Sequence, residues 1–199
     1  MKIILATRNP SKAEQIRGIF RGSSLSVLTL TEARIEGDAI EDGATLQENA
    51  LKKALFAWER TSPKVWTMAD DTGIFIHALN GEPGIRSSRW AGDTATTEEI
   101  TGYTLKRLEG VADRSATFET LVALVSPECE RHFFSGKVNG KILEAPRTKP
   151  QPKMPYSSIF VPDGTNQVWA EMTIDFENSI SHRGRAFRQA RAFLEYTNA

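Results

Sequence analysis

Apolar residues along this chain fall into two kinds of pattern, short continuous runs and stripes with helical spacing. Compact runs of the length expected for buried strands lie at residues 3–6, 25–30, 65–68 and 156–161. Amphipathic stripes that predict helices lie at residues 11–20, 46–60, 96–108 and 181–194. Alternation of apolar and polar positions predicts two antiparallel strands at residues 116–125 and 132–138. The pattern therefore predicts strands and amphipathic helices that follow one another along the chain.

Local signals place the ends of several of these elements. A Ser or Thr followed three residues later by Glu forms a capping box at a helix start. Such pairs are Ser11 with Glu14, Thr45 with Glu48, and Thr96 with Glu99. Asn-Gly pairs predict tight turns at residues 80–81 and 139–140. These signals predict where three helices begin and where the chain reverses.

Two adjacent carboxylates follow the apolar run at residues 65–68. Because neighbouring side chains in a strand point to opposite faces, Asp70 and Asp71 share one environment only if the chain turns there. We expect the strand to end at this pair and Thr72-Gly73 to form the turn. A carboxylate pair that holds a hard metal ion suits phosphate chemistry, and a polar turn that caps a strand is the alternative interpretation.

A polar loop at residues 7–10 follows the first strand and leads into a helix start. Such a junction binds anions, because free backbone N–H groups and the helix dipole point the same way. Lys12 lies in the first turn, where a cation opposes the dipole. It is either a surface lysine or a lysine placed to meet a phosphate. The glycines of a Walker loop are missing, so that motif does not explain the junction.

The amino-acid composition mainly excludes certain classes of protein and certain structural features. Lys and Arg number 25, Asp and Glu number 25, and the net charge is zero, so the chain lacks the basic excess of a protein that coats nucleic acid. The 40% share of hydrophobic residues is enough for a real core in one domain. The single cysteine, Cys129, excludes an internal disulfide, and no apolar stretch approaches the roughly 20 residues of a membrane span. We therefore expect a cytoplasmic protein that binds neither nucleic acid nor membrane.

Two further stretches carry candidate ligand contacts. Residues 145–155 form a loop rich in proline and lysine, and such a loop between strands is more often a lid or binding loop than a linker. His182 and Arg183 stand at the start of the last helix, where cations are not needed for helix stability. That position favours contact with a ligand for both side chains.

Four blocks, taken in order, resemble the inosine triphosphate pyrophosphatase family, also called non-canonical purine nucleoside triphosphate pyrophosphatases. The blocks are residues 5–12, residues 41–50, residues 69–73 with 79–85, and residues 181–184. Each block is modest alone, but the ordered set is specific and spans nearly the whole chain. The resemblance implies an α/β fold with a long mixed central β-sheet flanked by helices, in which an active-site cleft lies between two lobes. It also implies a single nucleotide pyrophosphatase domain over residues 1–199 and a homodimer.

The resemblance implies a reaction, the Mg²⁺-dependent hydrolysis of a nucleoside triphosphate to the monophosphate and pyrophosphate. Asp71 matches the general base that activates water. The residues that would hold Mg²⁺ are Glu41, Asp70 and Asp71. The substrate contacts are Thr7, Asn9, Lys12, Lys53, Thr72, Tyr156, Ser157, Glu177, His182 and Arg183.

The chain departs from the family pattern in the segment that shapes the base pocket. Met154 replaces an aromatic residue and Ser157 replaces an aspartate. Glu177 stands where the family has a lysine that meets the phosphates, and Lys149 or Lys153 could compensate for that loss. We therefore expect a pyrophosphatase whose preferred base is not simply inosine or xanthine. The alternatives are a catalytically altered nucleotide-binding protein and a different nucleotide hydrolase of the same fold.

Overall fold

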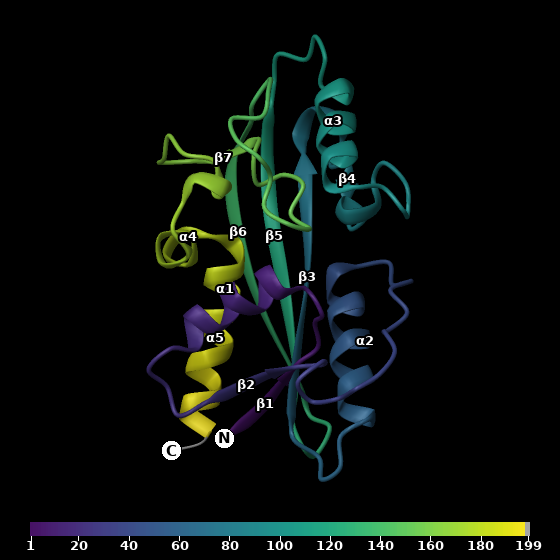
Figure 1. Cartoon of the computed structure of the whole chain (residues 1–199), viewed down its shortest axis with the longest axis vertical. Coiled ribbons are helices and arrows are strands. Elements are labelled where there is room, and N and C mark those ends of the chain that lie inside the picture. Colours follow the sequence, from purple (N-terminus) through teal and green to yellow (C-terminus); the bar gives the residue numbers. More distant parts are fainter. Residues whose placement is uncertain (198–199) are drawn as a thin grey trace.

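The computed structural model of the protein describes residues 1–197, which form a mixed seven-stranded sheet with helices on both sides (Figure 1). The strands are β1 (Lys2–Leu5), β2 (Ser26–Thr29), β3 (Trp66–Ile76), β4 (Pro83–Gly84), β5 (Ser115–Val125), β6 (Arg131–Ile142) and β7 (Phe160–Pro162). The helices are α1 (Pro10–Phe20), α2 (Leu46–Glu59), α3 (Thr97–Arg107), α4 (Ile174–Ile180) and α5 (His182–Thr197), with short 3₁₀ turns η1 (His77–Leu79), η2 (Ser87–Arg89) and η3 (Trp169–Glu171). The predicted α/β fold with a mixed central sheet is confirmed, whereas the division into two lobes and the single domain stay predictions.

The sheet combines a parallel part and an antiparallel part in the order β2-β1-β3-β5-β6-β7. β1 pairs in parallel with β2 and β3, and the connections run through α1 and α2. β3, β5 and β6 form long antiparallel pairs. Figure 1 shows α2 and α3 on one side of these long strands and α1, α4 and α5 on the other. The long strands therefore carry side chains toward helices on both sides.

One edge of β3 has no partner strand along its middle. β1 pairs with β3 only as far as Met68, and β4 pairs with it only at Ile74 and Phe75. Among the described residues, no strand pairs with residues 69–73 along this edge, whereas β5 pairs with them along the other. Side chains from both faces of β3 can therefore reach one opening between β1 and β4.

Helix α2 packs close to the sheet because its inner face is made of alanines. Ala50, Ala54 and Ala57 are fully buried in one cluster with Ala69 of β3 and Ala123 of β5. The spacing of packed elements depends on the size of the side chains at the contact, so these small residues let the helix backbone approach the sheet. The polar residues beside this face thereby come within reach of β3.

The predicted strand end at Asp70 and Asp71 is wrong. β3 continues to Ile76, and residues 70–73 pair in register with residues 119–122 of β5. The long partner strand keeps the chain extended through the residues that were expected to turn. Asp70 and Asp71 therefore point to opposite faces of the sheet, and each has its own environment.

Several local predictions are confirmed. The Thr96–Glu99 capping box is complete in both directions at the start of α3, and Thr45 caps α2. Asn80 and Gly81 form a turn with φ of 53° and 87°. Both lie in the left-handed region that asparagine and glycine tolerate best.

Other local predictions are wrong. Asn9, not Ser11, caps α1. Residues 139–140 continue β6 instead of turning, and a Cβ atom at Gly140 would lie only 2.3 Å from the carbonyl oxygen of Val161. Only the end of the run at residues 156–161 is strand, because the preceding residues form a turn closed by backbone hydrogen bonds.

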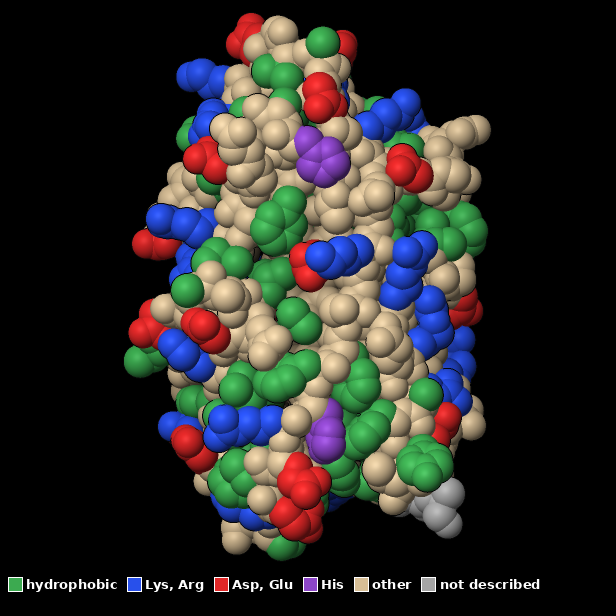
Figure 2. Space-filling view, turned by 180° about the vertical axis from the view of Figure 1, so that it is seen from behind, with side chains coloured by type: hydrophobic (Ala, Val, Ile, Leu, Met, Phe, Trp, Pro, Cys, Tyr) green, Lys and Arg blue, Asp and Glu red, His purple; other side chains and the backbone are tan. Residues whose placement is uncertain are grey.

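The surface carries charge of both signs. On the face opposite the view of Figure 1, basic and acidic side chains are intermixed over most of the area (Figure 2). This agrees with the zero net charge of the chain. None of the helices within residues 1–197 has the length and apolar content that a bilayer crossing requires.

Candidate active site

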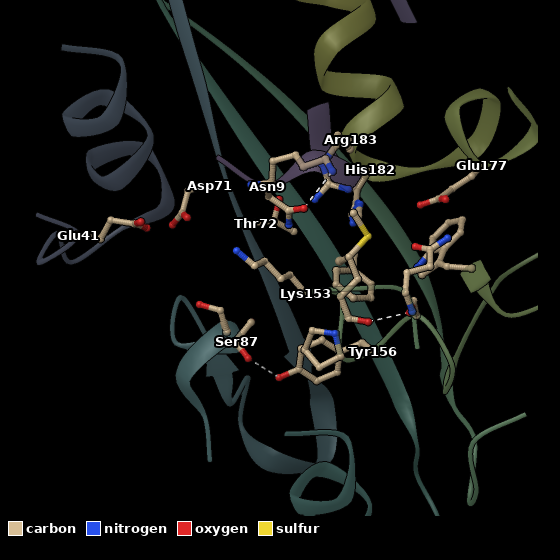
Figure 3. Close-up of a pocket in the computed structure, with 18 of the residues that line it drawn as sticks. Asn9, Glu41, Asp71, Thr72, Ser87, Lys153, Tyr156, Glu177, His182 and Arg183 are labelled. Atoms are coloured by element: carbon tan, nitrogen blue, oxygen red, sulfur yellow. Dashed lines mark hydrogen bonds between the residues drawn. The ribbon is translucent and has the colours of Figure 1, made fainter. Parts of the chain in front are cut away.

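A pocket of about 300 Å³ opens at the gap in the edge of β3 (Figure 3). The predicted site residues that line it are Asn9, Lys12, Glu41, Lys53, Asp71, Thr72, Tyr156, Ser157, Glu177, His182 and Arg183. The other two, Thr7 and Asp70, line an adjoining cavity of about 180 Å³ that shares Lys12, Glu41 and Lys53 with the pocket. The fold therefore brings the predicted site residues together from segments that lie far apart in the sequence.

Glu41, Lys53 and Asp71 form one end of the pocket, which we call the carboxylate end. Lys53 Nζ lies 2.8 Å from Asp71 Oδ1 and 3.1 Å from Glu41 Oε2, so one ammonium group is shared by two carboxylates. Asn49 Nδ2 lies 3.4 Å from Asp71 Oδ2. Burial raises the pKa of Asp71, and the charge of Lys53 opposes that shift. Asp71 is therefore a better proton acceptor than an exposed aspartate.

Asp70 lies on the other face of β3, where it holds two cations. Its Oδ1 is 3.1 Å from Lys12 Nζ and its Oδ2 is 3.5 Å from Arg183 Nε. Burial alone would raise the pKa of Asp70, but the charges of Lys12 and Arg183 outweigh it and hold that pKa below its usual range. The ionised carboxylate thus fixes two side chains that line the pocket.

Asn9 shapes the start of α1. Its Oδ1 accepts hydrogen bonds from the backbone N–H groups of Ser11 and Lys12, at 3.1 and 3.3 Å. The backbone N–H of Asn9 in turn donates to Thr7 Oγ1 at 3.2 Å. A phosphate at this helix start would therefore meet the ammonium group of Lys12 and compete with Asn9 for the backbone donors.

Phe118, Tyr156, Trp169 and His182 form the aromatic end of the pocket. The ring of His182 meets Phe118 edge-on at 4.5 Å and stacks on Trp169 at 6.0 Å, and the Tyr156 hydroxyl donates to the Ser87 carbonyl at 2.8 Å. Among the described residues, both ring nitrogens of His182 and Nε1 of Trp169 are buried without a hydrogen-bond partner. Burial holds the pKa of His182 well below its usual value, so the ring is neutral. A flat polar ring such as a nucleobase fits these walls and could satisfy these atoms.

The residues that depart from the family pattern lie near the aromatic end. The Ser157 hydroxyl accepts a hydrogen bond from the Gln151 N–H at 2.8 Å and donates to the Met154 carbonyl at 2.7 Å. Both hydrogen bonds hold the loop together, and Ser157 also lines the pocket. Lys153 lines the pocket, and Lys149 is not among the lining residues.

Glu177 lies on the side of the pocket remote from the carboxylate end (Figure 3). Figure 3 shows it close to His182, across the pocket from Glu41 and Asp71. The sequence interpretation assumed that this position faces the phosphates. Figure 3 shows its carboxyl group on the same side of the pocket as His182 and Arg183. Burial raises the pKa of Glu177, and the charge of Arg183 opposes that shift.

Several pocket residues were missed by sequence reasoning. Phe118, Gln151 and Trp169 line the pocket, and Asn49 contacts Asp71. Asn49 lies inside the second sequence block, so its position was a usable signal. Phe118 lies in a strand with alternating apolar residues, where the sequence alone indicates an ordinary core residue. No local sequence pattern marks Trp169 as a pocket residue.

Replacement of Asp70 by asparagine is expected to lower the free energy of unfolding by about 3 kcal/mol, because it leaves two largely buried cations without their partner. The folded-state pKa of Asp70 is depressed, so its contribution is present above the unfolded-state pKa of about 4 and is lost as pH falls through the folded-state value. Urea unfolding at pH 7 and at acid pH measures both effects. A variant as stable as the wild type at pH 7 would contradict this role.

Comparisons with known proteins agree with this site and fold. The sequence model of the Ham1 family matches residues 3–193. A dITP/XTP pyrophosphatase of Thermoanaerobacter sp. (strain X514) is 40% identical over 196 residues, which cover 98% of this chain and 96% of the relative. A solved HAM1 protein from Coxiella burnetii superposes with a TM-score of 0.85 and 34% identity over 100% of both chains. The Staphylococcus aureus Ham1 protein superposes with a TM-score of 0.83 and 30% identity over 99% of this chain and 100% of the other. The family resemblance of the four sequence blocks is confirmed, and the chain belongs to the Ham1 family.

Proposed function

We propose that this protein hydrolyses a purine nucleoside triphosphate to the nucleoside monophosphate and pyrophosphate. The observation that carries the proposal is one pocket with carboxylates and lysines at one end and aromatic side chains at the other. Such a pocket suits a molecule with a polyanionic tail and a flat base. The Thermoanaerobacter relative is named a dITP/XTP pyrophosphatase, so dITP and XTP are the first substrates to test.

Cations for the triphosphate come from four separate segments. Lys12 lies on α1, Lys53 on α2 and Arg183 on α5, and all three line the pocket. Lys153, from the loop before β7, lies between the carboxylate end and the aromatic end (Figure 3). We expect the phosphate tail along these cations and the base among the aromatic side chains, because each part then meets groups of matching chemistry.

Asp71 is the proposed general base. It would take a proton from a water molecule whose oxygen attacks the α-phosphorus. The bond between the α-phosphorus and the bridging oxygen then breaks, and its electron pair leaves with pyrophosphate. The raised pKa of Asp71 favours this proton transfer, and the adjacent Lys53 stabilises the carboxylate before it.

Mg²⁺ fits the carboxylate end. Lys53 Nζ contacts both Glu41 and Asp71, so these two carboxylates converge on one point. Within residues 1–197, no group of three or more His, Cys, Asp or Glu side chains is placed to hold a metal ion. Mg²⁺ is commonly held by one or two carboxylates together with substrate phosphates and waters, and it neutralises charge on the phosphates. Glu41 and Asp71 would hold the ion, and Asp70 would act by holding the two cations behind them.

Pyrophosphate release tests the proposed reaction. The purified protein would be assayed with dITP, XTP, dGTP and ATP in the presence of Mg²⁺. Release of pyrophosphate together with the monophosphate is the expected result. Tight nucleotide binding without turnover would favour a binding protein, and release of free base or nucleoside would favour a different hydrolase.

Metal removal is expected to lower turnover by about 100-fold or more, because the phosphates lose a divalent counter-charge. EDTA followed by excess Mg²⁺ measures the loss and its recovery. The thermal unfolding midpoint should stay unchanged, since Lys53 pairs with Glu41 and Asp71 without the ion. Full turnover in EDTA would contradict the metal requirement.

We also propose that the protein is a homodimer, as the family resemblance implies, and that it is cytoplasmic, as its single cysteine indicates. Light scattering compares its mass in solution with the 22.1 kDa of one chain. A mass equal to one chain at assay concentrations would contradict the dimer.

A further inference from the structure

The carboxyl group of Glu177 is buried in the pocket wall without an ionic partner. The residue is 3% exposed and lines the pocket. Within residues 1–197, no Lys, Arg or His nitrogen lies within 4.0 Å of its carboxylate oxygens. Burial raises the pKa of Glu177, while the charge of Arg183 and the amides of Gln15 and Gln151 lower it. A buried carboxylate is costly unless hydrogen-bond donors satisfy it, so a ligand that brings donors would relieve this cost.

Buried polar groups lie near this carboxyl group. Arg183, which is paired with Asp70, donates from Nη1 to Gln15 Oε1. This bond leaves the Gln15 NH₂ group to approach Glu177, where it lowers the pKa of the acid. A carboxylate has about four lone-pair sites on two oxygens, so the protein amides leave acceptor capacity toward the pocket.

The position of Glu177 decides which part of a nucleotide it would meet. It lies across the pocket from Glu41 and Asp71 and close to His182 (Figure 3). A carboxylate beside the triphosphate would repel it, whereas a carboxylate beside the base can accept from N–H groups. The unpartnered nitrogens of His182 and Trp169 lie at the same end of the pocket. A base held among the aromatic side chains would therefore turn one edge toward Glu177.

We propose that Glu177 selects the base of the substrate by accepting two neighbouring N–H donors, one from the ring and one from an amino group. Guanine offers this pair, N1–H beside the 2-amino group, to the two carboxylate oxygens. Hypoxanthine keeps N1–H but lacks the amino group, and xanthine sets a carbonyl oxygen on each side of N1–H, which the carboxylate repels. Adenine has an acceptor at N1. The expected order of preference is guanine, then hypoxanthine, then xanthine and adenine. This inference rests on the proposed pyrophosphatase function and names the preferred base for the same pocket.

The matched substrates dGTP and dITP, which differ only in the 2-amino group, test this order. The wild-type kcat/KM for dGTP is expected to exceed that for dITP by about tenfold or more, the discrimination typical of a hydrogen bond to a charged group. Glu177→Gln should lose most of this ratio, because an amide offers one acceptor and one donor. Glu177→Lys should reverse it, because an ammonium group only donates. Since both substrates are compared on one preparation, partial unfolding of a variant leaves the ratio intact.

Asp175→Asn is the matched control, because Asp175 is an exposed carboxylate on the same helix and its ionic partner within residues 1–197 is Arg21. It should keep the wild-type ratio. A wild-type ratio of one or less, or a ratio that Glu177→Gln leaves unchanged, would overturn the selection by Glu177 while the pyrophosphatase function stands. Release of pyrophosphate from none of dGTP, dITP, XTP and ATP would instead overturn the proposed function itself.

Discussion

Replacement of Asp71 by asparagine is expected to lower kcat for triphosphate hydrolysis by about 10²- to 10⁴-fold. Asparagine keeps the shape of the side chain but cannot take the proton from water. Lys53 keeps Glu41 as its partner, so the pocket retains its cation and nucleotide binding should persist. Pyrophosphate release gives kcat, and titration calorimetry gives nucleotide affinity. Because a protonated Asp71 cannot accept a proton from water, wild-type activity should fall on the acid side, and this acid limb should vanish in the variant.

The control for this prediction is Asp42→Asn. Asp42 is an exposed carboxylate close in sequence to Glu41, and it pairs with Lys52 on the outside of α2. Its loss should change kcat by no more than about twofold, as for other surface substitutions. If Asp71→Asn keeps kcat within about tenfold of the wild type, another group must activate the water.

Replacement of Lys153 by methionine is expected to lower kcat/KM by about ten- to 100-fold, the loss typical of one charge-assisted hydrogen bond. Methionine keeps much of the length of the side chain but removes the charge that we assign to the phosphate tail. Lys153 lines the pocket between its two ends (Figure 3). Steady-state kinetics with the best purine triphosphate of the panel measures the change, and a rise in KM should account for part of it.

Lys149→Met provides the matched control on the same loop. Both lysines were candidates to compensate for Glu177, and only Lys153 is among the residues that line the pocket. The Lys149 variant should therefore stay within about twofold of the wild type. Equal losses in the two variants would mean that the loop acts through its overall charge, and no loss in either would remove Lys153 from the phosphate site.

Local structure was predictable where local interactions decide it. The Thr96–Glu99 box, the Thr45 cap and the turn at Asn80-Gly81 depend on side chains and backbone within a few residues of one another. Helix α4 was not predicted, because its seven residues are too few to show a periodic stripe. The candidate site was predictable only because four separated blocks occur together, and no single block would have sufficed.

The chemistry of the two adjacent aspartates depended on contacts that sequence spacing does not contain. The pairing of β3 with β5 keeps the chain extended through Asp70 and Asp71, so the two carboxylates face different partners. Asp70 meets Lys12 and Arg183, whereas Asp71 meets Lys53. A carboxylate pair that was expected to share a turn thus becomes one group that holds cations and one that faces the pocket.

The sequence by itself determined the order of the longer strands and helices, most helix starts and the identity of the charged residues that line the pocket. Periodicity, caps and residue type are properties of short segments, which explains why they are visible in the chain alone. Tertiary structure alone decided the gap in the edge of β3, the pairing of Asp70 with two cations and the place of Glu177 across the pocket from the carboxylate end. Each of these arises where segments distant in sequence meet, and their packing sets both the distance between charges and the burial that shifts their pKa values.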